Sequence, residues 1–86
     1  MTKNIVLLEF YSDTCRPCKI MMPIAEKIAN KRNIPIEKTE IGNDIEKAKM
    51  YGIKSVPTFV LLQNGREVKR ITGVVSQNRF DEFLNI

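Results

Sequence analysis

Two cysteines separated by two residues, Cys15 and Cys18, are the side chains of this sequence best suited to chemistry. They follow the apolar run from Ile5 to Phe10 and stand where a helix-like pattern begins. The unpaired N–H groups and the dipole of a helix's first turn favour a thiolate over a thiol. Because the second sulfur lies within the same turn, the pair can close a disulfide and act as a reversible two-electron switch.

Other uses of a cysteine pair have to be weighed against redox chemistry. A disulfide that closes so short a loop stabilises a fold by only roughly 2 kcal/mol in the chain-entropy estimate, which makes a structural staple a poor explanation. A structural zinc site needs four ligands, and the sequence has no His and no third Cys. A zinc ion or iron–sulfur cluster shared between two protomers, or a spacing without function, stay as alternatives to the redox role that we favour.

The composition indicates one small domain. The chain has 86 residues, of which 43% are hydrophobic and 28% charged, as in soluble globular proteins. The formal charge of +4 comes from scattered basic residues interleaved with acids, so no nucleic-acid interface is indicated. The apolar run after Lys3 is shorter than the roughly 7 to 15 residues of a secretory signal or the roughly 20 of a spanning helix. We therefore expect a single domain over residues 1–86, no membrane association, a monomer and a cytoplasmic location.

The first half of the chain predicts alternating strands and helices. Residues 5–11 form a nearly continuous apolar run, typical of a strand covered on both faces. From residue 15 to about 30, apolar residues recur at helical spacing around Pro23. Residues 34–41 suggest a second strand, and residues 45–51 a short helix that residues 42–44 cap and Gly52 ends.

The second half predicts a hairpin and a closing helix. Residues 58–63 have strong β-propensity, Asn64-Gly65 is a two-residue hairpin signal, and residues 66–72 fit a loosely alternating edge strand. Ser76 is a good N-cap for a helix whose apolar face includes Phe80 and Phe83. The predicted order β-α-β-α-β-β-α describes an α/β domain with a four-stranded mixed sheet and three helices.

Several short motifs follow one another along this chain in a specific order. They are Thr14-Cys15-Arg16-Pro17-Cys18-Lys19, Pro23, Tyr51-Gly52-Ile53, Val56-Pro57-Thr58-Phe59, Asn64-Gly65 and Thr72-Gly73-Val74-Val75-Ser76. In this order and spacing they resemble the thioredoxin/glutaredoxin superfamily over nearly the whole chain, and they are most similar to a short thioredoxin. The resemblance implies the compact thioredoxin fold.

The chain departs from the family pattern in three places. Thioredoxins usually have Trp-Cys-Gly-Pro-Cys, whereas here Thr14 replaces the Trp and Arg16 the Gly. The first strand begins close to Met1, which is glutaredoxin-like. The Gly-Gly pair and following Asp that hold glutathione in glutaredoxins are nevertheless missing at Gly73-Val74-Val75. These departures leave the electron donor open without affecting the dithiol chemistry.

The position before the helix makes Cys15 the expected nucleophile and Cys18 the resolving cysteine. Arg16 and Lys19 are cations that can stabilise the Cys15 thiolate. Unless its side chain points to solvent, Arg16 should therefore raise the reduction potential above the roughly −270 mV of thioredoxin. Pro17 limits backbone freedom between the two cysteines.

Glu9 is the one carboxyl group within the first apolar strand. It falls where thioredoxins keep a buried Asp, and Lys38 falls where the family places a Lys beside that acid. The resemblance implies that Glu9 takes the proton of Cys18, because burial would raise its pKa. A carboxyl group that reaches water at a strand end, and a solvated Lys38, are the alternatives.

The resemblance also implies a shallow groove for substrates. Pro57 matches the family's cis-proline opposite the cysteines, and the backbone of Val56 would hydrogen-bond an extended substrate segment. An ordinary trans turn before the strand is the alternative for Pro57. Four further residues would complete the groove: Thr14, Arg16, Gly73 and Val74.

We therefore expect a thiol-disulfide oxidoreductase that reduces disulfide-containing proteins and needs no metal and no organic cofactor. A thioredoxin-reductase-type or glutathione-type electron donor would reload its dithiol. One alternative is a glutaredoxin-like enzyme coupled to glutathione. Another is a non-catalytic module that uses the thioredoxin surface to bind a partner.

Overall fold

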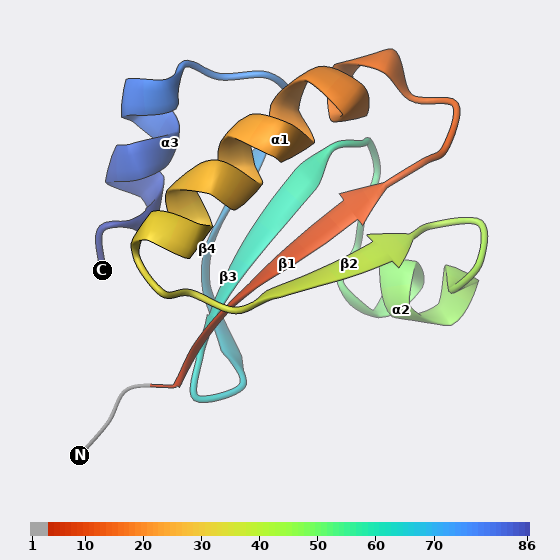
Figure 1. Ribbon diagram of the computed structural model, residues 1–86. Coiled ribbons are helices and arrows are strands. Elements are labelled where there is room, and N and C mark those ends of the chain that lie inside the picture. The colour runs from red at the N-terminus through yellow and green to blue at the C-terminus, as the bar shows by residue number, and fades with distance from the viewer. Residues whose placement is uncertain (1–3) are drawn as a thin grey trace.

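The computed structural model describes residues 4–86, in which three helices pack on a four-stranded sheet (Figure 1). The strands are β1 (Ile5–Tyr11), β2 (Ile36–Glu40), β3 (Thr58–Gln63) and β4 (Arg66–Thr72). The helices are α1 (Arg16–Lys31), α2 (Ile45–Met50) and α3 (Gln77–Leu84). The order of the elements confirms the predicted order β-α-β-α-β-β-α. Residues 1–3 lie outside the part of the chain that the structure describes. Within residues 4–86, no helix has both the length and the apolar character needed to cross a membrane.

The sheet is mixed, with the strand order β2-β1-β3-β4. β2 runs parallel to β1, whereas β3 is antiparallel to both β1 and β4. Phe10 lies opposite Thr58, and Thr58 lies opposite Thr72. The end of β1, the start of β3 and the end of β4 therefore share one edge of the sheet, which brings the loops after Tyr11, before Thr58 and after Thr72 to the same end.

Alternate residues of the strands enter two separate cores, as expected for a sheet covered on both faces. Figure 1 shows α1 and α3 on one face of the sheet and α2 toward the other. The larger core joins α1 and α3 to the sheet and includes Leu7, Met21, Phe59, Phe80 and Phe83. The smaller core contains Leu8, Phe10 and Val60, against which Tyr51 and Ile53 pack. The burial of Phe80 and Phe83 agrees with the apolar face predicted for the closing helix.

Three predicted elements have different bounds in the structure. The helix predicted from residue 15 begins at Arg16, because Cys15 is its N-cap. The strand predicted over residues 34–41 covers only Ile36–Glu40. It is preceded by a turn at Asn33, where φ is 57°, and by Pro35, which has no N–H to donate to a neighbouring strand. The short helix ends at Met50 rather than at residue 51, with Tyr51 as its C-cap.

The hairpin between β3 and β4 follows the predicted turn, because Asn64 and Gly65 have φ values of 54° and 81°. The register between β3 and β4 is irregular at one place: Leu61 of β3 lies opposite Lys69, and the next residue, Leu62, lies opposite Glu67. This irregularity places one extra residue in β4 and explains why the strand alternates only loosely in sequence.

Candidate redox site

Cys15 and Cys18 form a disulfide at the first turn of α1, with their Cα atoms 5.3 Å apart. Cys15 is the N-cap of the helix, and its Sγ accepts a hydrogen bond of 3.2 Å from the Cys18 N–H. Pro17 fits this first turn because the missing N–H would have no intrahelical partner there. Cys15 is partly exposed, whereas Cys18 is only 1% exposed. The two sulfurs thus differ in access, with Cys15 toward solvent and Cys18 behind it.

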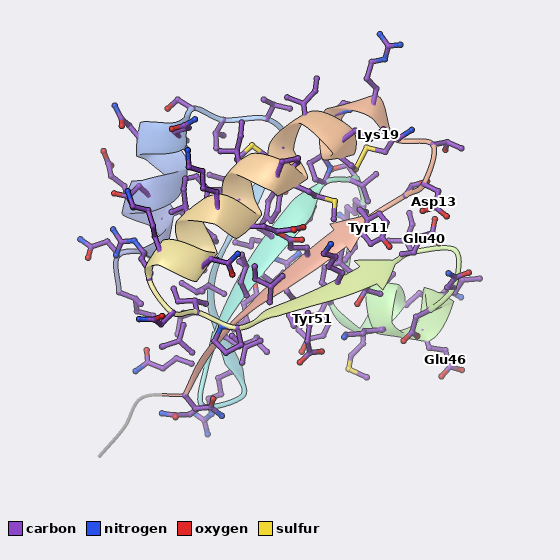
Figure 2. The ribbon with its side chains drawn as sticks, in the orientation of Figure 1. Tyr11, Asp13, Lys19, Glu40, Glu46 and Tyr51 are labelled. Carbon is purple, nitrogen blue, oxygen red and sulfur yellow. A yellow bond between two sulfur atoms is a disulfide. The ribbon has the colours of Figure 1, made fainter. Side chains whose placement is uncertain are left out.

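Positive charge surrounds the start of this helix. The first turn of α1 contains no acidic residue, and Arg16 and Lys19 both occupy exposed positions in it. Figure 2 shows Lys19 near the beginning of α1, above the loop that contains Asp13. With the helix dipole acting in the same direction, these charges favour a thiolate at Cys15 when the disulfide is reduced.

Glu9 is completely buried in the middle of β1, so the alternative in which it reaches water is wrong. Its strand neighbours are Lys38 on β2 and Phe59 on β3. Within the described residues, neither carboxyl oxygen has a partner with hydrogen-bond geometry. The pKa of Glu9 is raised from the ordinary 4.5 to about 8, mainly by burial and also by hydrogen bonding and like charge from the nearby Glu26 carboxyl, while Lys38 acts in the opposite direction. The interaction with Glu26 is thus a close approach of two carboxyl groups, which becomes a hydrogen bond only when one is suitably placed and protonated.

Glu26 is a residue of the site that the sequence did not single out. Its carboxylate lies 3.2 Å from the Lys38 ammonium, and the Lys38 side chain is half exposed. The contact with this carboxylate raises the pKa of Lys38. Lys38 therefore lies beside Glu9 in the sheet, as the resemblance implied, but its ion pair is with Glu26.

A cleft of about 370 Å³ leads from solvent to the buried cysteine. Three segments line it: Tyr11–Asp13 after β1, the α1 residues Cys18, Lys19, Met22, Pro23 and Glu26, and Lys38 of β2. The cleft thus connects the inner sulfur with the Glu26–Lys38 pair.

Glu40, at the end of β2, fastens the loop before the cysteines and was also not predicted. Its Oε1 accepts hydrogen bonds from the N–H groups of Gly42 (2.7 Å) and Asn43 (3.0 Å), and its Oε2 accepts one from Asp13 (3.2 Å). Figure 2 shows Glu40 and Tyr11 near each other where their strands end, with Asp13 beyond them. A Cβ at Gly42 would meet Glu40 Oε1 at 2.9 Å, so a glycine suits this close approach. One carboxylate thus ties together the loops that follow β1 and β2.

The predicted groove residues come from the shared edge of the sheet. The Val56–Pro57 peptide bond is cis, as the resemblance implied, and Pro57 is fully buried. The Gly73 N–H donates a hydrogen bond of 2.9 Å to the Pro57 carbonyl, which joins the two loops. Val74 is 51% exposed, and Thr14 is exposed at the end of the cysteine loop.

Within residues 4–86, no group of three or more His, Cys, Asp or Glu residues is placed to hold a metal ion.

The raised pKa of Glu9 predicts that stability falls as pH rises from about 4.5 to about 8. Because the folded-state pKa of about 8 exceeds the ordinary value of 4.5, the native state holds this proton more tightly than the unfolded chain. Stability from this source is complete below the ordinary value and is lost progressively as pH rises from there through about 8, by an amount on the order of 5 kcal/mol. We expect Glu9→Gln to remove this loss, as measured by urea unfolding of the oxidised protein at acidic, neutral and alkaline pH.

Glu46→Gln is the matched control, because Glu46 is an exposed residue of α2. This variant should keep the wild-type dependence on pH. Parallel curves of stability against pH for Glu9→Gln and the wild type would contradict the assignment of this loss to Glu9.

The three hydrogen bonds that the Glu40 carboxylate accepts, which we call the loop clamp, predict that Glu40→Ala loosens the segment before Cys15. Loss of the Glu40 carboxylate leaves the Asp13 N–H without its acceptor, so we expect the Asp13 amide to exchange its hydrogen about tenfold faster or more. The cost in stability should be about 1–2 kcal/mol, since the three hydrogen bonds are exposed. Glu37→Ala is the control, because Glu37 lies on the same strand and pairs with Lys47 instead. Unchanged exchange at Asp13 in Glu40→Ala would rule out the clamp.

Comparison with known proteins agrees with the geometry of the site. The family model named Thioredoxin matches residues 1–86. A thioredoxin of Chlamydia caviae is 32% identical over 83 residues, which are 95% of this chain and 81% of that protein. The bifunctional thioredoxin reductase/thioredoxin of Mycobacterium leprae is 36% identical over 79% of this chain, which corresponds to 15% of that larger protein.

A solved structure gives the same picture in three dimensions. A single-site mutant of a thioredoxin from Halobacterium salinarum NRC-1 superimposes with a TM-score of 0.87 and 28% identity, and the match covers 94% of this chain and 72% of that one. Because it has a disulfide at the N-cap of α1 and is similar to these proteins over nearly its whole length, the chain is a thiol-disulfide oxidoreductase that belongs to the thioredoxin family.

Proposed function

We propose that this protein reduces disulfide bonds in other proteins, with Cys15 as the nucleophile and Cys18 as the resolving cysteine. The observation that carries this proposal is the unequal access to the two sulfurs. Cys15 is partly exposed at the cap of α1, whereas Cys18 is buried beside the cleft. A bulky protein disulfide can therefore be attacked by Cys15 and not by Cys18.

The reaction passes two electrons from the dithiol to the substrate. The Cys15 thiolate attacks one sulfur of the substrate disulfide, which breaks that bond, forms a mixed disulfide and releases one substrate thiolate. Cys18, once deprotonated, attacks the Cys15 sulfur, forms the Cys15–Cys18 bond and releases the second substrate thiolate. The two released thiolates take up protons, one from solvent and one that originates on Cys18.

Glu9 is the proposed partner for the Cys18 proton. It lies on the sheet face that α1 covers, where its neutral form is favoured by burial. When an electron donor attacks Cys15 of the disulfide, protonated Glu9 can give its proton to the departing Cys18 sulfur. In the opposite direction, ionised Glu9 can accept the proton as Cys18 attacks.

The proposed substrate groove lies along the shared edge of the sheet. Val56, Pro57 and the Gly73–Val74 segment come from loops that a hydrogen bond joins, and Val74 presents exposed apolar surface. An extended substrate segment could pair with the backbone of Val56, which recognises shape rather than sequence. Thr14 and Arg16 would border the groove on the helix side.

We propose a thioredoxin-reductase-type electron donor. The larger relative from Mycobacterium leprae, named as both reductase and thioredoxin, supports this choice over a glutathione-type donor. We also propose that the protein acts as a monomer in the cytoplasm, where a disulfide of this kind is transient and catalytic.

The proposed activity can be tested by following insulin reduction with NADPH and a thioredoxin reductase. We expect sustained turnover by the wild type, and loss of turnover in Cys15→Ser because the nucleophile is missing. Cys18→Ser should instead accumulate mixed disulfides with its protein targets, which mass spectrometry can identify. Faster turnover of a glutathione mixed disulfide than of insulin would favour the glutaredoxin-like alternative, and partner capture by Cys15→Ser, Cys18→Ser would favour a binding module.

The cation at Arg16 predicts a shifted reduction potential. Because a positive charge stabilises the reduced thiolate, Arg16→Gly should lower the potential by roughly 10–20 mV, which is the effect of an exposed charge interaction of about 0.5–1 kcal/mol. Equilibration with a glutathione redox buffer measures this change.

Arg66→Gly provides a control with the same change in charge. Arg66 is exposed and begins β4 beside the hairpin, at the end of the sheet opposite the cysteines. Its replacement should leave the potential unchanged. An unchanged potential in Arg16→Gly as well would discard the tuning role of Arg16.

A further inference from the structure

The side of α1 that faces the cleft carries a carboxyl group two turns beyond the inner cysteine. Cys18, Met22 and Glu26 are spaced four residues apart along the helix, so they follow one stripe, and all three line the cleft. Lys38, on β2, contacts the last residue of this stripe, because its ammonium lies 3.2 Å from the Glu26 carboxylate. The cleft therefore contains a polar pair, and both of its members influence the ionisation of the buried Glu9.

Glu9 itself has no direct access to solvent. Its oxygens are inaccessible and have no hydrogen-bond partner within residues 4–86. Phe59 flanks it on β3, whereas Lys38 flanks it on β2. Glu26 lies close enough to influence its ionisation, and the Glu26 side chain is itself 27% exposed.

We propose that Glu26, held by Lys38, is the positioning residue through which Glu9 exchanges its proton with the solvent of the cleft. This inference rests on the proposed role of Glu9 in proton transfer with Cys18. It extends that role, because Glu9 alone can hold a proton but has no exposed atom through which to lose it. Glu26 supplies carboxylate oxygens that can take the proton on the inner side and release it on the outer side.

The proton balance of the resolving step shows when this route is needed. Below about pH 8, Glu9 already carries a proton before Cys18 attacks. It must pass that proton outward before it can accept the one on Cys18, so one proton leaves the site for each disulfide closed. Above that pH, Glu9 begins ionised and can accept the Cys18 proton directly.

Other titratable or charged groups lie around this route. Glu26 and Cys18 face it from α1, Lys38 from β2 and Tyr11 from the end of β1. Lys19 and Asp13 line the outer part of the cleft. Of these groups, Glu26 is the carboxyl group that influences both Glu9 and Lys38.

Glu26→Gln tests the proposal because it keeps the shape of the side chain and removes its ability to carry a proton. Reduced protein is mixed with an aryl disulfide that releases one thionitrobenzoate when Cys15 attacks and a second when Cys18 resolves. At about pH 6.5 we expect the second release to slow about tenfold, less than the roughly 10²–10⁴-fold effect of removing a direct proton acceptor. Added imidazole, a small base with a pKa near this pH, should restore the rate, and at about pH 9.5 the variant should approach the wild type.

The first release is an internal control for folding, because it depends on Cys15 and should keep the wild-type rate. Glu26→Asp, which retains a carboxyl group, should recover part of the second rate, and Glu46→Gln should behave as the wild type throughout. A second release in Glu26→Gln that is as fast as the wild type at about pH 6.5 would overturn the proposal. Slowing that is equal at both pH values and insensitive to imidazole would also overturn it.

Glu9→Gln separates this inference from the function on which it rests. If that variant resolves slowly at both pH values while Glu26→Gln behaves as the wild type, Glu9 keeps its role and only the Glu26 route fails. If Glu9→Gln resolves at the wild-type rate, the proton-transfer role of Glu9 fails, and the Glu26 route fails with it.

Discussion

The burial of one ionisable group between a sheet and a helix is the constraint on which the rest of this structure depends. Glu9 has no exposed surface and no hydrogen-bond partner among the described residues. A buried polar group without a partner costs about 1–3 kcal/mol, and a charged one more. That cost is large beside the roughly 5–15 kcal/mol by which small domains are usually stable. The apolar cores on both faces of the sheet must offset it, and the proton transfer with Cys18 that we propose for Glu9 would be a reason for keeping an acid there.

Much of the fold could be predicted from local signals in the sequence. The Asn64-Gly65 turn, the Ser76 cap and the glycine after α2 act over a few residues, so their effect depends little on the remainder of the chain. The element order and the bounds of three strands were therefore correct. The start of β2 and the register shift in β4 were not predicted, because each depends on how a strand meets its neighbour.

Some residues of the candidate site could likewise be predicted from the sequence, and others could not. The cysteines and Glu9 could be recognised because each is unusual within its own segment. Glu26 looks like an ordinary acid on a helix, and it gains a role only when α1 packs over β1 and β2 brings Lys38 alongside. The four-residue spacing from Cys18 was a usable signal for Glu26. For Glu40, whose three hydrogen bonds span two loops, no comparable pattern existed in the sequence.

The two edge strands of the sheet carry features that disfavour pairing with other copies of this chain. β4 is an edge strand that carries Arg66, Glu67, Lys69 and Arg70 and is interrupted by its irregular register. β2, the opposite edge, likewise carries Glu37, Lys38 and Glu40. Dense charge and a local kink discourage strand-to-strand aggregation. Backbone pairing with substrates would then be confined to the groove proposed at Val56, which leaves the protein free to dissociate from each substrate after the reaction.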